Sequence, residues 1–567
     1  MTMSDDADQV TAGAALFLRL RALGVDMVFC NAGTDFPPII EGLAEATATG
    51  AAMPEAVLAP HEHAAMGMAH GYYLASGRPQ AVILHTNVGL ANGAIGALNA
   101  ATAQVPILLM SGRTSVVEKG RFGARTVPIA WGQEMRDQAA LVREAVKWDY
   151  ELRYPEQLVD LLDRALAIAR SSPPGPVYLS LPLEVLCEPC PAAKLERPPA
   201  MLSTARAPDA ALVRQVAEAL AAAERPLVIA QRGAGSAAAF AALAELLDRW
   251  AIPISHYWAT ELAVPSLHPT NVGQALEPFL QEADVVVVLD GLAPWSPDRG
   301  EPAPDAMVVQ IAPDPLFQRT PIRNFRSDVA LAGDVDRTVL ALADAMAEQR
   351  PETLAVEARR HRVTAAVDDL RRARAEADAS DTPLTKGAVA RILSAAIAAC
   401  DPVVFSELGC PLDSLDLRRH DAWHQEPHAG GLGWSFPAAL GFKLAQRQRL
   451  VVATMGDGSY VFANPVACHQ IAAALGVPVL VVVLNNAEWH AVRRSVVGLY
   501  PEGHAAKANR VPLTSLAPSP DFATVARASG AFARTVEDAT GLRRALNEAL
   551  THLHQEPSLA LLDVRIA

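Results

Sequence analysis

The sequence predicts an α/β protein made of several parallel-sheet domains. Helical and strand-like segments alternate along almost the whole chain, which is typical of parallel sheets covered by helices on both faces. The chain has 567 residues, too many for one hydrophobic core, so several domains are expected. A proline-rich stretch at 187–200 and a charged stretch at 345–381 interrupt the alternation, which indicates three domains.

We expect the first domain at residues 1–190, the second at 205–345 and the third at 382–567, each a Rossmann-like parallel-sheet fold. The stretch at 187–200 is interpreted as an extended linker, and the stretch at 345–381 as a solvated helical connector. The first and third domains are similar enough to be distant copies of one fold, although no repeat of residues proves it.

Short apolar runs mark the strands, and segments with helical spacing of apolar residues mark the helices. Strands are predicted at 27–30, 80–85, 106–111 and 176–181 in the first domain, at 226–230, 284–289 and 307–311 in the second, and at 402–406, 450–455, 477–484 and 559–564 in the third. Helices are predicted at 11–23, 64–75, 91–103, 158–170, 209–223 and 467–475.

Composition disfavours several classes of protein. The formal net charge is −14, and an acidic chain repels phosphate backbones, so no nucleic acid partner is expected. Six cysteines are too few for a disulfide framework, and Cys187 and Cys190 lack the second pair of a zinc ribbon. The acidic N-terminus does not resemble a signal peptide, and the most apolar run, 472–484, is too short to span a bilayer. A cytoplasmic protein without a membrane partner is expected.

Two polar clusters follow predicted strands of the third domain. Gly456-Asp457-Gly458-Ser459 comes directly after the strand at 450–455, and Asn485-Asn486 comes directly after the strand at 477–484. Both clusters therefore lie at the carboxyl edge of one parallel sheet, where ligands bind in folds of this kind.

The residue types in these clusters suit a magnesium ion and a phosphate group. Mg²⁺ prefers oxygen ligands, which Asp457, Asn486 and the backbone carbonyl of Glu488 can offer. Gly458 lets the backbone approach a phosphate closely, and the start of the helix that follows, at Ser459, favours anions.

The spacing of the two clusters resembles the signature of thiamine-diphosphate-dependent enzymes, in which Gly-Asp-Gly precedes an Asn pair at a characteristic distance. In this chain 26 residues lie between Gly458 and Asn485. The resemblance covers nearly the whole chain and implies a pyrimidine-binding, a central and a diphosphate-binding domain. It also implies thiamine diphosphate and Mg²⁺ as cofactors, and a homodimer or homotetramer with active sites between subunits.

A second segment, residues 60–72, reads Pro-His-Glu-His-Ala-Ala-Met-Gly-Met-Ala-His-Gly-Tyr. It resembles the segment of the same family that carries the activating glutamate, here Glu62. The resemblance implies that Glu62 hydrogen-bonds the aminopyrimidine ring of the cofactor and favours its imino form. An apolar helix start suits a carboxyl group that shares a proton. Taken alone, Glu62 would be interpreted as a helix N-terminal residue interacting with the dipole.

A third segment, residues 428–434, reads His-Ala-Gly-Gly-Leu-Gly-Trp and resembles the family's segment beneath the cofactor. The resemblance implies that Gly430 offers its carbonyl to the cofactor amine and that Leu432 holds the cofactor in a bent form. It further implies that Gly409 and Cys410 bind the diphosphate through backbone groups.

The sequence defines the reaction less closely than the cofactor. His85 ends the strand at 80–85, where benzoylformate decarboxylase carries a proton-transferring histidine, and a histidine can act this way near neutral pH. His490 and Trp489, close after the Asn pair, are candidates for the substrate pocket. The resemblance favours a decarboxylase or carboligase acting on a 2-oxo acid or aldehyde, with Glu62, His85 and His490 as catalytic residues.

Several alternatives stay open. One is an acetolactate-synthase-like transferase, although Gly112-Arg113 and Gln133-Glu134-Met135 depart from that enzyme's pattern. Others are an acyl-coenzyme A lyase and a catalytically silent cofactor-binding paralogue. Gly233-Ala-Gly235 resembles part of a dinucleotide fingerprint without its acidic residue, so a dinucleotide-dependent dehydrogenase and FAD binding by the central domain are not favoured.

Overall fold

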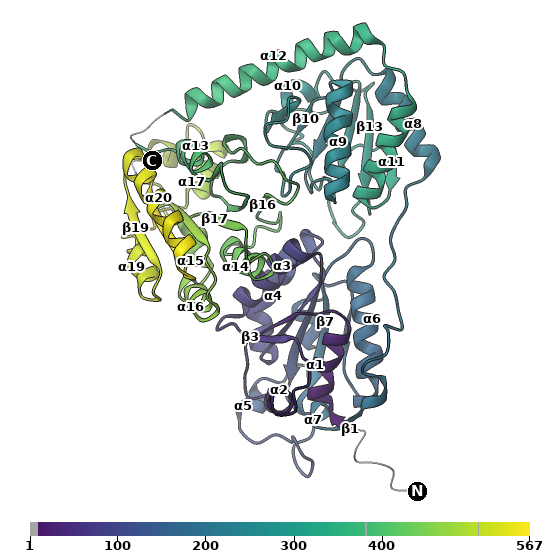
Figure 1. Ribbon diagram of the computed structural model, residues 1–567, viewed down its shortest axis with the longest axis vertical. Helices are drawn as coiled ribbons and strands as arrows, with labels where there is room; N and C mark the ends of the chain where they lie inside the picture. The colour runs from purple at the N-terminus through teal and green to yellow at the C-terminus, as the bar shows by residue number, and fades with distance from the viewer. Residues whose placement is uncertain (1–8, 380–382, 509) are drawn as a thin grey trace.

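The structure, a computed structural model, describes residues 9–379, 383–508 and 510–567. These residues form three six-stranded sheets and one two-stranded sheet. Every strand pairing in the large sheets is parallel. Helices cover each large sheet, and the sheets occupy successive parts of the chain (Figure 1). The predicted α/β class with three Rossmann-like parallel-sheet domains is confirmed.

The first sheet has the strand order β3-β2-β4-β5-β7-β6. Strands β4 and β7 are buried along their whole length, as parallel strands covered on both faces should be. The strands are β2 (Met27–Cys30), β3 (Glu55–Leu58), β4 (Gln80–Leu84), β5 (Ile107–Arg113), β6 (Asp149–Glu151) and β7 (Val177–Pro182), and the longer helices are α1 (Ala12–Ala22), α2 (Pro37–Thr49), α3 (Glu62–Ser76), α4 (Thr86–Thr102) and α6 (Leu158–Arg170).

The second sheet has the order β11-β10-β9-β12-β13-β14. Numbered within the sheet this is 3-2-1-4-5-6, the strand order of dinucleotide-binding folds. Its strands are β9 (Pro226–Ala230), β10 (Ile254–Ser255), β11 (Asn271–Gly273), β12 (Val285–Leu289), β13 (Met307–Ala312) and β14 (Val329–Ala332), with helices α8 (Ala210–Ala222), α9 (Ala237–Trp250), α10 (Glu277–Leu280) and α11 (Val335–Glu348).

The third sheet has the order β16-β15-β17-β18-β20-β19. Its strands are β15 (Pro402–Glu407), β16 (Trp423–Gln425), β17 (Leu450–Gly456), β18 (Leu480–Asn485), β19 (Phe532–Val536) and β20 (Ala560–Arg565). Its helices include α13 (Lys386–Ile397), α14 (Ser435–Ala445), α15 (Asp457–Phe462), α16 (Pro465–Leu475), α17 (His490–Leu499), α18 (His504–Lys507), α19 (Phe522–Arg527) and α20 (Ala539–Gln555).

The first and third sheets share one topology. Numbered within each sheet, both have the strand order 2-1-3-4-6-5. This agreement supports the expectation that the two domains are copies of one fold, which the residues alone could not prove.

The prediction of an extended linker at 187–200 is wrong for its first half. Strand β8 (Pro189–Pro191) pairs antiparallel with β1 (Gln9–Thr11) and returns the chain to the start of the first domain. The carbonyls of Leu195 and Arg197 then accept hydrogen bonds from the buried Arg19 guanidinium, at 2.8 and 2.6 Å. Proline content predicted extended backbone, but these contacts hold the segment against helix α1.

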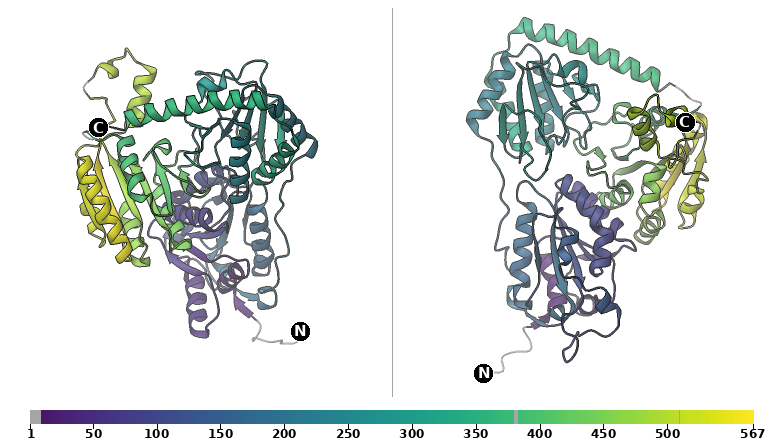
Figure 2. Two further views of the ribbon diagram at one scale, coloured as in Figure 1. Left: turned by 45° about the horizontal axis from the view of Figure 1, so that its top comes forward. Right: turned by 180° about the vertical axis from the view of Figure 1, so that it is seen from behind.

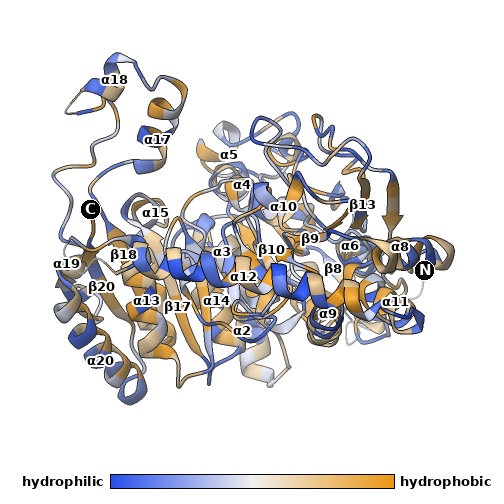
Figure 3. Ribbon diagram, turned by 90° about the horizontal axis from the view of Figure 1, so that it is seen from above, coloured by the Kyte–Doolittle hydropathy of each residue, from blue (hydrophilic) through white to orange (hydrophobic). Residues whose placement is uncertain are grey.

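The charged connector is a helix, as predicted. Helix α12 (Thr353–Ala377) runs from the second domain to the third along the top of Figure 1, and the rotated views in Figure 2 show it on the outside of the molecule. It is hydrophilic over most of its length (Figure 3). Its buried Arg359 donates a hydrogen bond of 2.9 Å to the carbonyl of Trp250, which anchors the helix to the second domain. Across the described ranges, no helix combines the length and the apolar character needed to cross a membrane.

Small residues bring the first and third domains into close contact. Helix α3 packs on α14, and both helices carry glycines at the crossing (Figure 1). A Cβ atom on Gly71 would lie 1.8 Å from the carbonyl oxygen of Ala438, and one on Gly441 would lie 2.0 Å from that of Met68. The helix that begins at Glu62 is therefore held rigidly against the segment that follows Gly430 and Leu432.

Candidate active site

The Gly-Asp-Gly cluster lies at the carboxyl edge of the third sheet, as predicted. Strand β17 ends at Gly456, and Asp457 begins helix α15. Asp457 is only 3% exposed, and burial raises the pKa of its carboxyl group. Its Oδ1 accepts a hydrogen bond of 3.0 Å from the Gly458 amide, whereas Oδ2 has no hydrogen-bond partner within the described part of the chain. A buried carboxylate oxygen without a partner is costly unless a ligand pairs with it.

The Asn pair forms the turn beside Asp457. The backbone amide of Ala487, in a left-handed conformation with φ +53°, lies next to the Asp457 carboxyl group. Asn486 Oδ1 accepts a hydrogen bond of 3.1 Å from the Glu488 amide, and the Glu488 carbonyl accepts one of 2.8 Å from His490. These oxygens retain acceptor capacity, so Asp457, Asn486 and Glu488 can hold a hard cation together.

Asn485 has a structural role in this turn. Its Nδ2 donates a hydrogen bond of 2.9 Å to the buried Asp563, and its Oδ1 accepts one of 3.1 Å from Ala487. Asn485 thus fixes the turn that presents Asn486. Groups of three or more His, Cys, Asp or Glu side chains suited to a metal are not found among the described residues, and a site with one carboxylate, one amide and one carbonyl does not require such a group.

Trp489 covers the glycine of the motif. A Cβ atom on Gly458 would lie 2.2 Å from the Trp489 ring, which also meets Phe462 edge-on at 5.7 Å between centroids. Ser459 is only 2% exposed, and its hydroxyl group lies beside the buried Glu407 carboxyl group. Gly458 is therefore required for close packing, and Ser459 brings a hydroxyl group to the same edge of the sheet.

Gly409 and Cys410, the other residues expected to contact the diphosphate, differ in how far their backbone groups are already engaged. A Cβ atom on Gly409 would lie 2.4 Å from the carbonyl oxygen of Thr454, so glycine is required there by the neighbouring strand. The Cys410 amide already donates a hydrogen bond of 3.1 Å to Thr454 Oγ1. The Cys410 amide is thus engaged within the chain, and the backbone of Gly409 is the better candidate for a ligand.

Gly430 and Leu432 line a cavity between the second and third domains. Gly430 has φ +68°, a conformation that favours glycine, and its amide donates a hydrogen bond of 2.9 Å to Pro427. The segment is fixed from the first domain, because Asn99 of α4 exchanges two hydrogen bonds with Gly431, at 2.8 and 3.2 Å.

Lys386 was missed by the sequence analysis. It is the first residue of α13, and its Nζ donates to the carbonyl of Leu408, next to Gly409. Burial lowers the pKa of Lys386, and the neighbouring Cys410, Glu426 and Asp457 act in the opposite direction. The residue places an amine at the expected diphosphate site, and no motif marks it because it lies far from the Gly-Asp-Gly cluster in the sequence.

Glu62 begins α3 and is buried, with 7% of its surface exposed. Asn92 of α4 donates a hydrogen bond of 3.1 Å to its Oε2. A Cβ atom on Gly89 would lie 3.1 Å from its Oε1, so a glycine keeps the space around the second oxygen open. Asn92 holds the carboxyl group in place, and the sequence pattern gave no indication of this residue.

His85 is the N-cap residue of α4 at the same edge of the first sheet. Its Nδ1 lies 2.5 Å from Asp35 Oδ1, and its Nε2 lies 3.1 Å from the Gln133 amide nitrogen. The hydrogen bond that His85 donates to Asp35 raises the pKa of His85, burial lowers it, and the charge of Glu62 adds to the increase. His85 and Glu62 are therefore electrostatic neighbours, and Asp35 and Gln133 are partners that the sequence did not indicate.

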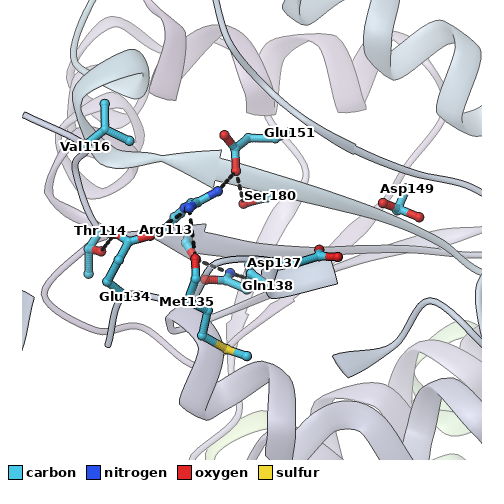
Figure 4. A network of polar contacts seen from close by, with 12 residues as sticks. Arg113, Thr114, Val116, Glu134, Met135, Asp137, Gln138, Asp149, Glu151 and Ser180 are labelled. Atoms are coloured by element: carbon cyan, nitrogen blue, oxygen red, sulfur yellow. Dashed lines mark hydrogen bonds and ion pairs between the residues drawn. The ribbon is translucent and has the colours of Figure 1, made fainter. Parts of the chain in front are cut away.

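A network of ion pairs and hydrogen bonds surrounds Arg113 and Glu134, the residue after Gln133 (Figure 4). Arg113, at the end of β5, lies between Glu151 and Glu134, with 2.7 Å to Glu134. Thr114 donates to the other oxygen of Glu134 at 2.9 Å, and Gln138 donates to the Gly112 carbonyl, also at 2.9 Å. The sequence showed Gly112-Arg113 and Gln133-Glu134-Met135 as departures from a pattern, and the structure shows that Arg113 and Glu134 of these segments pair.

His490 lies on the surface, apart from the other predicted catalytic residues. It is the first residue of α17, its side chain is 47% exposed, and burial together with nearby cations lowers its pKa. Helix α17 has no buried residue, and Figure 3 shows it projecting from the body of the chain. In the described residues, the recorded hydrogen bonds, ion pairs and ring contacts do not join His490 to Glu62 or His85.

The glycines of the second domain are explained by packing within the chain. Gly233 and Gly235 have φ of +67° and +81°. A Cβ atom would lie 2.9 Å from the Leu262 carbonyl oxygen at Gly233 and 3.0 Å from the Asp336 amide at Gly235. Packing and backbone conformation therefore explain the two glycines without a bound nucleotide.

Comparison with known proteins adds independent findings. Residues 10–141, 213–342 and 410–564 match, in turn, the N-terminal TPP binding, central and C-terminal TPP binding domains of the thiamine pyrophosphate enzyme family. The chain is 30% identical over 556 residues to the probable 2-ketoarginine decarboxylase AruI of Pseudomonas aeruginosa, covering 95% of this chain and 91% of that protein. It is 27% identical over 503 residues to benzoylformate decarboxylase of the same species, covering 85% of this chain and 87% of the relative.

Solved structures share the fold. The thiamine diphosphate-dependent 4-hydroxybenzoylformate decarboxylase of Rhodococcus jostii RHA1 superposes with a TM-score of 0.77 at 21% identity, covering 98% of this chain and 99% of that one. Benzoylformate decarboxylase of Polynucleobacter necessarius gives a TM-score of 0.75 at 23% identity, covering 98% of both chains.

Proposed function

Since the chain belongs to the thiamine pyrophosphate enzyme family, we propose that it uses thiamine diphosphate and Mg²⁺ to decarboxylate a 2-oxo acid, with ligation to an aldehyde as a second outcome. The relatives named 2-ketoarginine decarboxylase and benzoylformate decarboxylase support a decarboxylase. An acetolactate-synthase-like reaction is the second candidate, supported by a relative from Parasynechococcus marenigrum that is 26% identical over 584 residues.

The third domain has the residues for a magnesium diphosphate group. The unpartnered Oδ2 of Asp457 would bind the metal, with the Asn486 amide oxygen and the Glu488 carbonyl as further ligands. The backbone at Gly458, the Ser459 hydroxyl and the Lys386 amine would meet the phosphate oxygens. This donor set of hard oxygens beside an anion cradle is the chemistry that the group requires.

The first domain has the residues for proton transfer. The bound cofactor supplies an electron sink for cleavage of a carbon–carbon bond beside a carbonyl group. Glu62, held by Asn92, would hold a proton at the aminopyrimidine ring. His85, held by Asp35 and Gln133, would deliver a proton where carbon dioxide leaves and would accept one in the reverse sense.

The His85–Asp35 pair is the observation that carries the choice of decarboxylation. Release of an aldehyde needs a proton at the reacting carbon, and an imidazole whose pKa is raised by a buried carboxylate is a suitable source near neutral pH. Ligation to a second 2-oxo acid does not need this proton at the same step. A His85 that supplies this proton would therefore favour the decarboxylase over the synthase.

A homodimer with active sites between subunits is proposed as the working unit. Glu62 and His85 lie at the edge of one domain and Asp457 at the edge of another, and in the described ranges no recorded hydrogen bond or ion pair joins the two groups of side chains. Apolar side chains are exposed near both edges: Val88, Ile95 and Leu98 on α4, and Val461, Phe462 and Val466 on α15 and α16. A second copy would cover these surfaces and bring the two edges together. A tetramer is the larger form of the same assembly.

The test is product analysis with a panel of aryl, alkyl and charged 2-oxo acids. The protein is loaded with thiamine diphosphate and Mg²⁺, and carbon dioxide, aldehyde and ligated product are measured together. The proposal predicts one aldehyde per carbon dioxide for the best substrate. One acetolactate-type product per carbon dioxide would favour the synthase, and no release from any acid would reject both.

A further inference from the structure

A cavity of about 690 Å³ lies between the second and third domains, beside the expected cofactor site. Gly430 and Leu432 form part of its wall, which places it next to the expected position of the reacting atoms. Four aromatic side chains from the second domain line the opposite wall: Tyr257, Trp258, Trp295 and Phe325. Among the described residues that line this cavity, one carboxyl group is present, that of Glu426.

Contacts within the second domain hold the aromatic wall in place. Trp295 meets Phe325 edge-on, with 5.1 Å between centroids and an interplanar angle of 88°. Arg323 lies behind Phe325 and donates a hydrogen bond of 2.8 Å to the Gly291 carbonyl. Gln231 donates to the carbonyls of Tyr257 and Ala293, at 3.0 and 2.9 Å, and so ties the two loops together. Such a wall needs little reorganisation to receive a ligand.

Glu426 lines the same cavity from the third domain. It follows β16, and its amide donates a hydrogen bond of 3.0 Å to the Ser406 carbonyl. The Leu408 amide lies beside one part of the carboxyl group, whereas Oε2 is buried and lacks a hydrogen-bond partner in the part of the chain that the structure describes. Burial and the nearby Glu407 raise the pKa of Glu426 to about 8, while Lys386, whose amine is turned to the Leu408 carbonyl, lowers it slightly.

We propose that this cavity binds the side chain of a cationic 2-oxo acid, one that ends in a guanidinium or ammonium group, between Glu426 and the aromatic wall. The inference rests on the proposed function and names its substrate class. Cations are attracted to the faces of aromatic rings, and the attraction is stronger where water is excluded. A cation beside Glu426 favours the ionised form of its carboxyl group, against the effect of burial, and a charge-assisted hydrogen bond to Oε2 would then satisfy the unpaired carboxyl oxygen.

An aryl side chain fits the wall but not the carboxyl group. It would leave the buried Oε2 of Glu426 without a partner, and an unsatisfied buried acceptor is unfavourable. Sites built around a hydrogen-bonding group discriminate strongly against ligands that lack the complementary group. The Glu426 carboxyl group should therefore make the site selective for a cationic substrate over an aryl or alkyl one.

The test compares the wild-type holoenzyme with Glu426→Gln and with Glu282→Gln. Glutamine keeps the size of Glu426 and cannot ionise beside a bound cation. Glu282 is 59% exposed and pairs with Arg225 on the surface, so the second variant removes an equal charge away from the cavity. The substrates are four 2-oxo acids of matched length that end in guanidinium, ammonium, urea and phenyl groups. We expect the highest kcat/KM for the two cationic acids, a loss of about 10²-fold for these in Glu426→Gln, and no change in Glu282→Gln.

A binding measurement decides the inference independently of turnover. Butylguanidinium and its neutral isostere butylurea are titrated calorimetrically into the three holoproteins. Butylguanidinium should bind wild type and Glu282→Gln alike and bind Glu426→Gln at least tenfold more weakly, whereas butylurea should bind all three proteins equally.

Equal binding of the two probes, or binding of butylguanidinium that Glu426→Gln leaves unchanged, would overturn the cation site. A preference for the phenyl acid with an unchanged Glu426→Gln would also overturn it while leaving the decarboxylase intact. Absence of carbon dioxide from every acid would reject the decarboxylase, and the titration would still decide whether the cavity binds cations.

Discussion

Nδ1 of His85 lies 2.5 Å from Oδ1 of Asp35, and two glycines enclose the pair. A Cβ atom on Gly33 would lie 2.1 Å from the His85 ring, and one on Gly112 would lie 1.6 Å from Asp35 Oδ2. Asp35 follows β2 and His85 follows β4, which are neighbouring strands. The sheet thus builds the pair at its carboxyl edge and leaves neither side chain room to turn away.

Asp35→Asn should lower the pKa of His85, because the hydrogen bond that the ring donates to Asp35 is the largest cause of its raised pKa. If protonated His85 is the proton donor, activity falls as pH rises through this pKa. The alkaline limb of the kcat/KM profile should therefore move to lower pH in the variant. Asp26→Asn, which changes a carboxyl group that pairs with Arg78 in the same domain, should leave the limb in place. An unmoved limb in Asp35→Asn would exclude the pair as the proton source.

The same pair should contribute to stability in a pH-dependent way. The folded-state pKa of His85 is raised, so its contribution is fully present below the pKa of an unfolded histidine and is lost as pH rises through the raised value. Asp35→Asn should thus reduce the thermal midpoint more at pH 6 than at pH 9, as measured by differential scanning calorimetry. An equal reduction at both values would show that the loss comes from packing rather than from the charge pair.

Gly458→Ala should weaken cofactor binding by displacing Trp489, whose ring a Cβ atom would approach to 2.2 Å. We expect a loss of more than tenfold in thiamine diphosphate affinity, or about 1.4 kcal/mol, measured by isothermal titration with Mg²⁺ present. The double variant Gly458→Ala/Trp489→Ala should recover part of this loss, since the clash is removed. Additive losses in the double variant would show that the two positions act separately.

Lys386→Met should reduce thiamine diphosphate affinity, because it removes an amine beside the Gly409 and Asp457 edge. The loss should be roughly tenfold at low ionic strength and smaller in high salt, as expected for an electrostatic contact. Lys507→Met, at a residue that is 66% exposed and paired with Glu502, is the control. Unchanged affinity in Lys386→Met at low salt would show that Lys386 does not contact the cofactor and serves only to bind the Leu408 carbonyl.

Gly71→Ala should destabilise the contact between the first and third domains. The added Cβ would lie 1.8 Å from the Ala438 carbonyl oxygen in the backbone of α14, which cannot move as a flexible side chain would. Overpacking of this kind costs about 1–3 kcal/mol, seen as a lower thermal midpoint. Gly132→Ala has no atom within 4 Å of the new Cβ and should leave the midpoint unchanged. Equal midpoints for the two variants would contradict the close helix crossing.

The fold and the motif residues were predictable because their signals are local. Alternating strands and helices indicated parallel sheets, and Gly456-Asp457-Gly458 and Asn485-Asn486 each follow a strand directly. Small errors arose where tertiary contacts decide the backbone. Asn464, with φ +51°, is the N-cap residue of α16, so the helix predicted at 467–475 begins at Pro465 and is separate from the short helix α15 that contains Ser459.

The partners of the site residues were not predictable in the same way. Asp35 lies 50 residues before His85, and Asn92 lies 30 residues after Glu62. Lys386 and Glu426 are isolated residues without a sequence motif and meet the site only through the arrangement of domains. A single sequence does not encode which polar residue from another strand end or domain completes a hydrogen bond. The hydrogen bond from the Cys410 amide to Thr454 on the next strand was not predictable for the same reason, and the contact of Cys410 with a diphosphate stays a prediction.

Substitution of Glu62 by glutamine, followed by carbon dioxide release and cofactor titration on the same preparation, tests the central claim most directly. Glutamine keeps the shape of the side chain beside Asn92 and Gly89 but cannot hold and return the proton. The account predicts that the variant still binds thiamine diphosphate with Mg²⁺ and loses about 10²-fold or more of its decarboxylation rate. A variant that binds the cofactor and releases carbon dioxide at the wild-type rate would contradict the assignment of Glu62 and, with it, of this site.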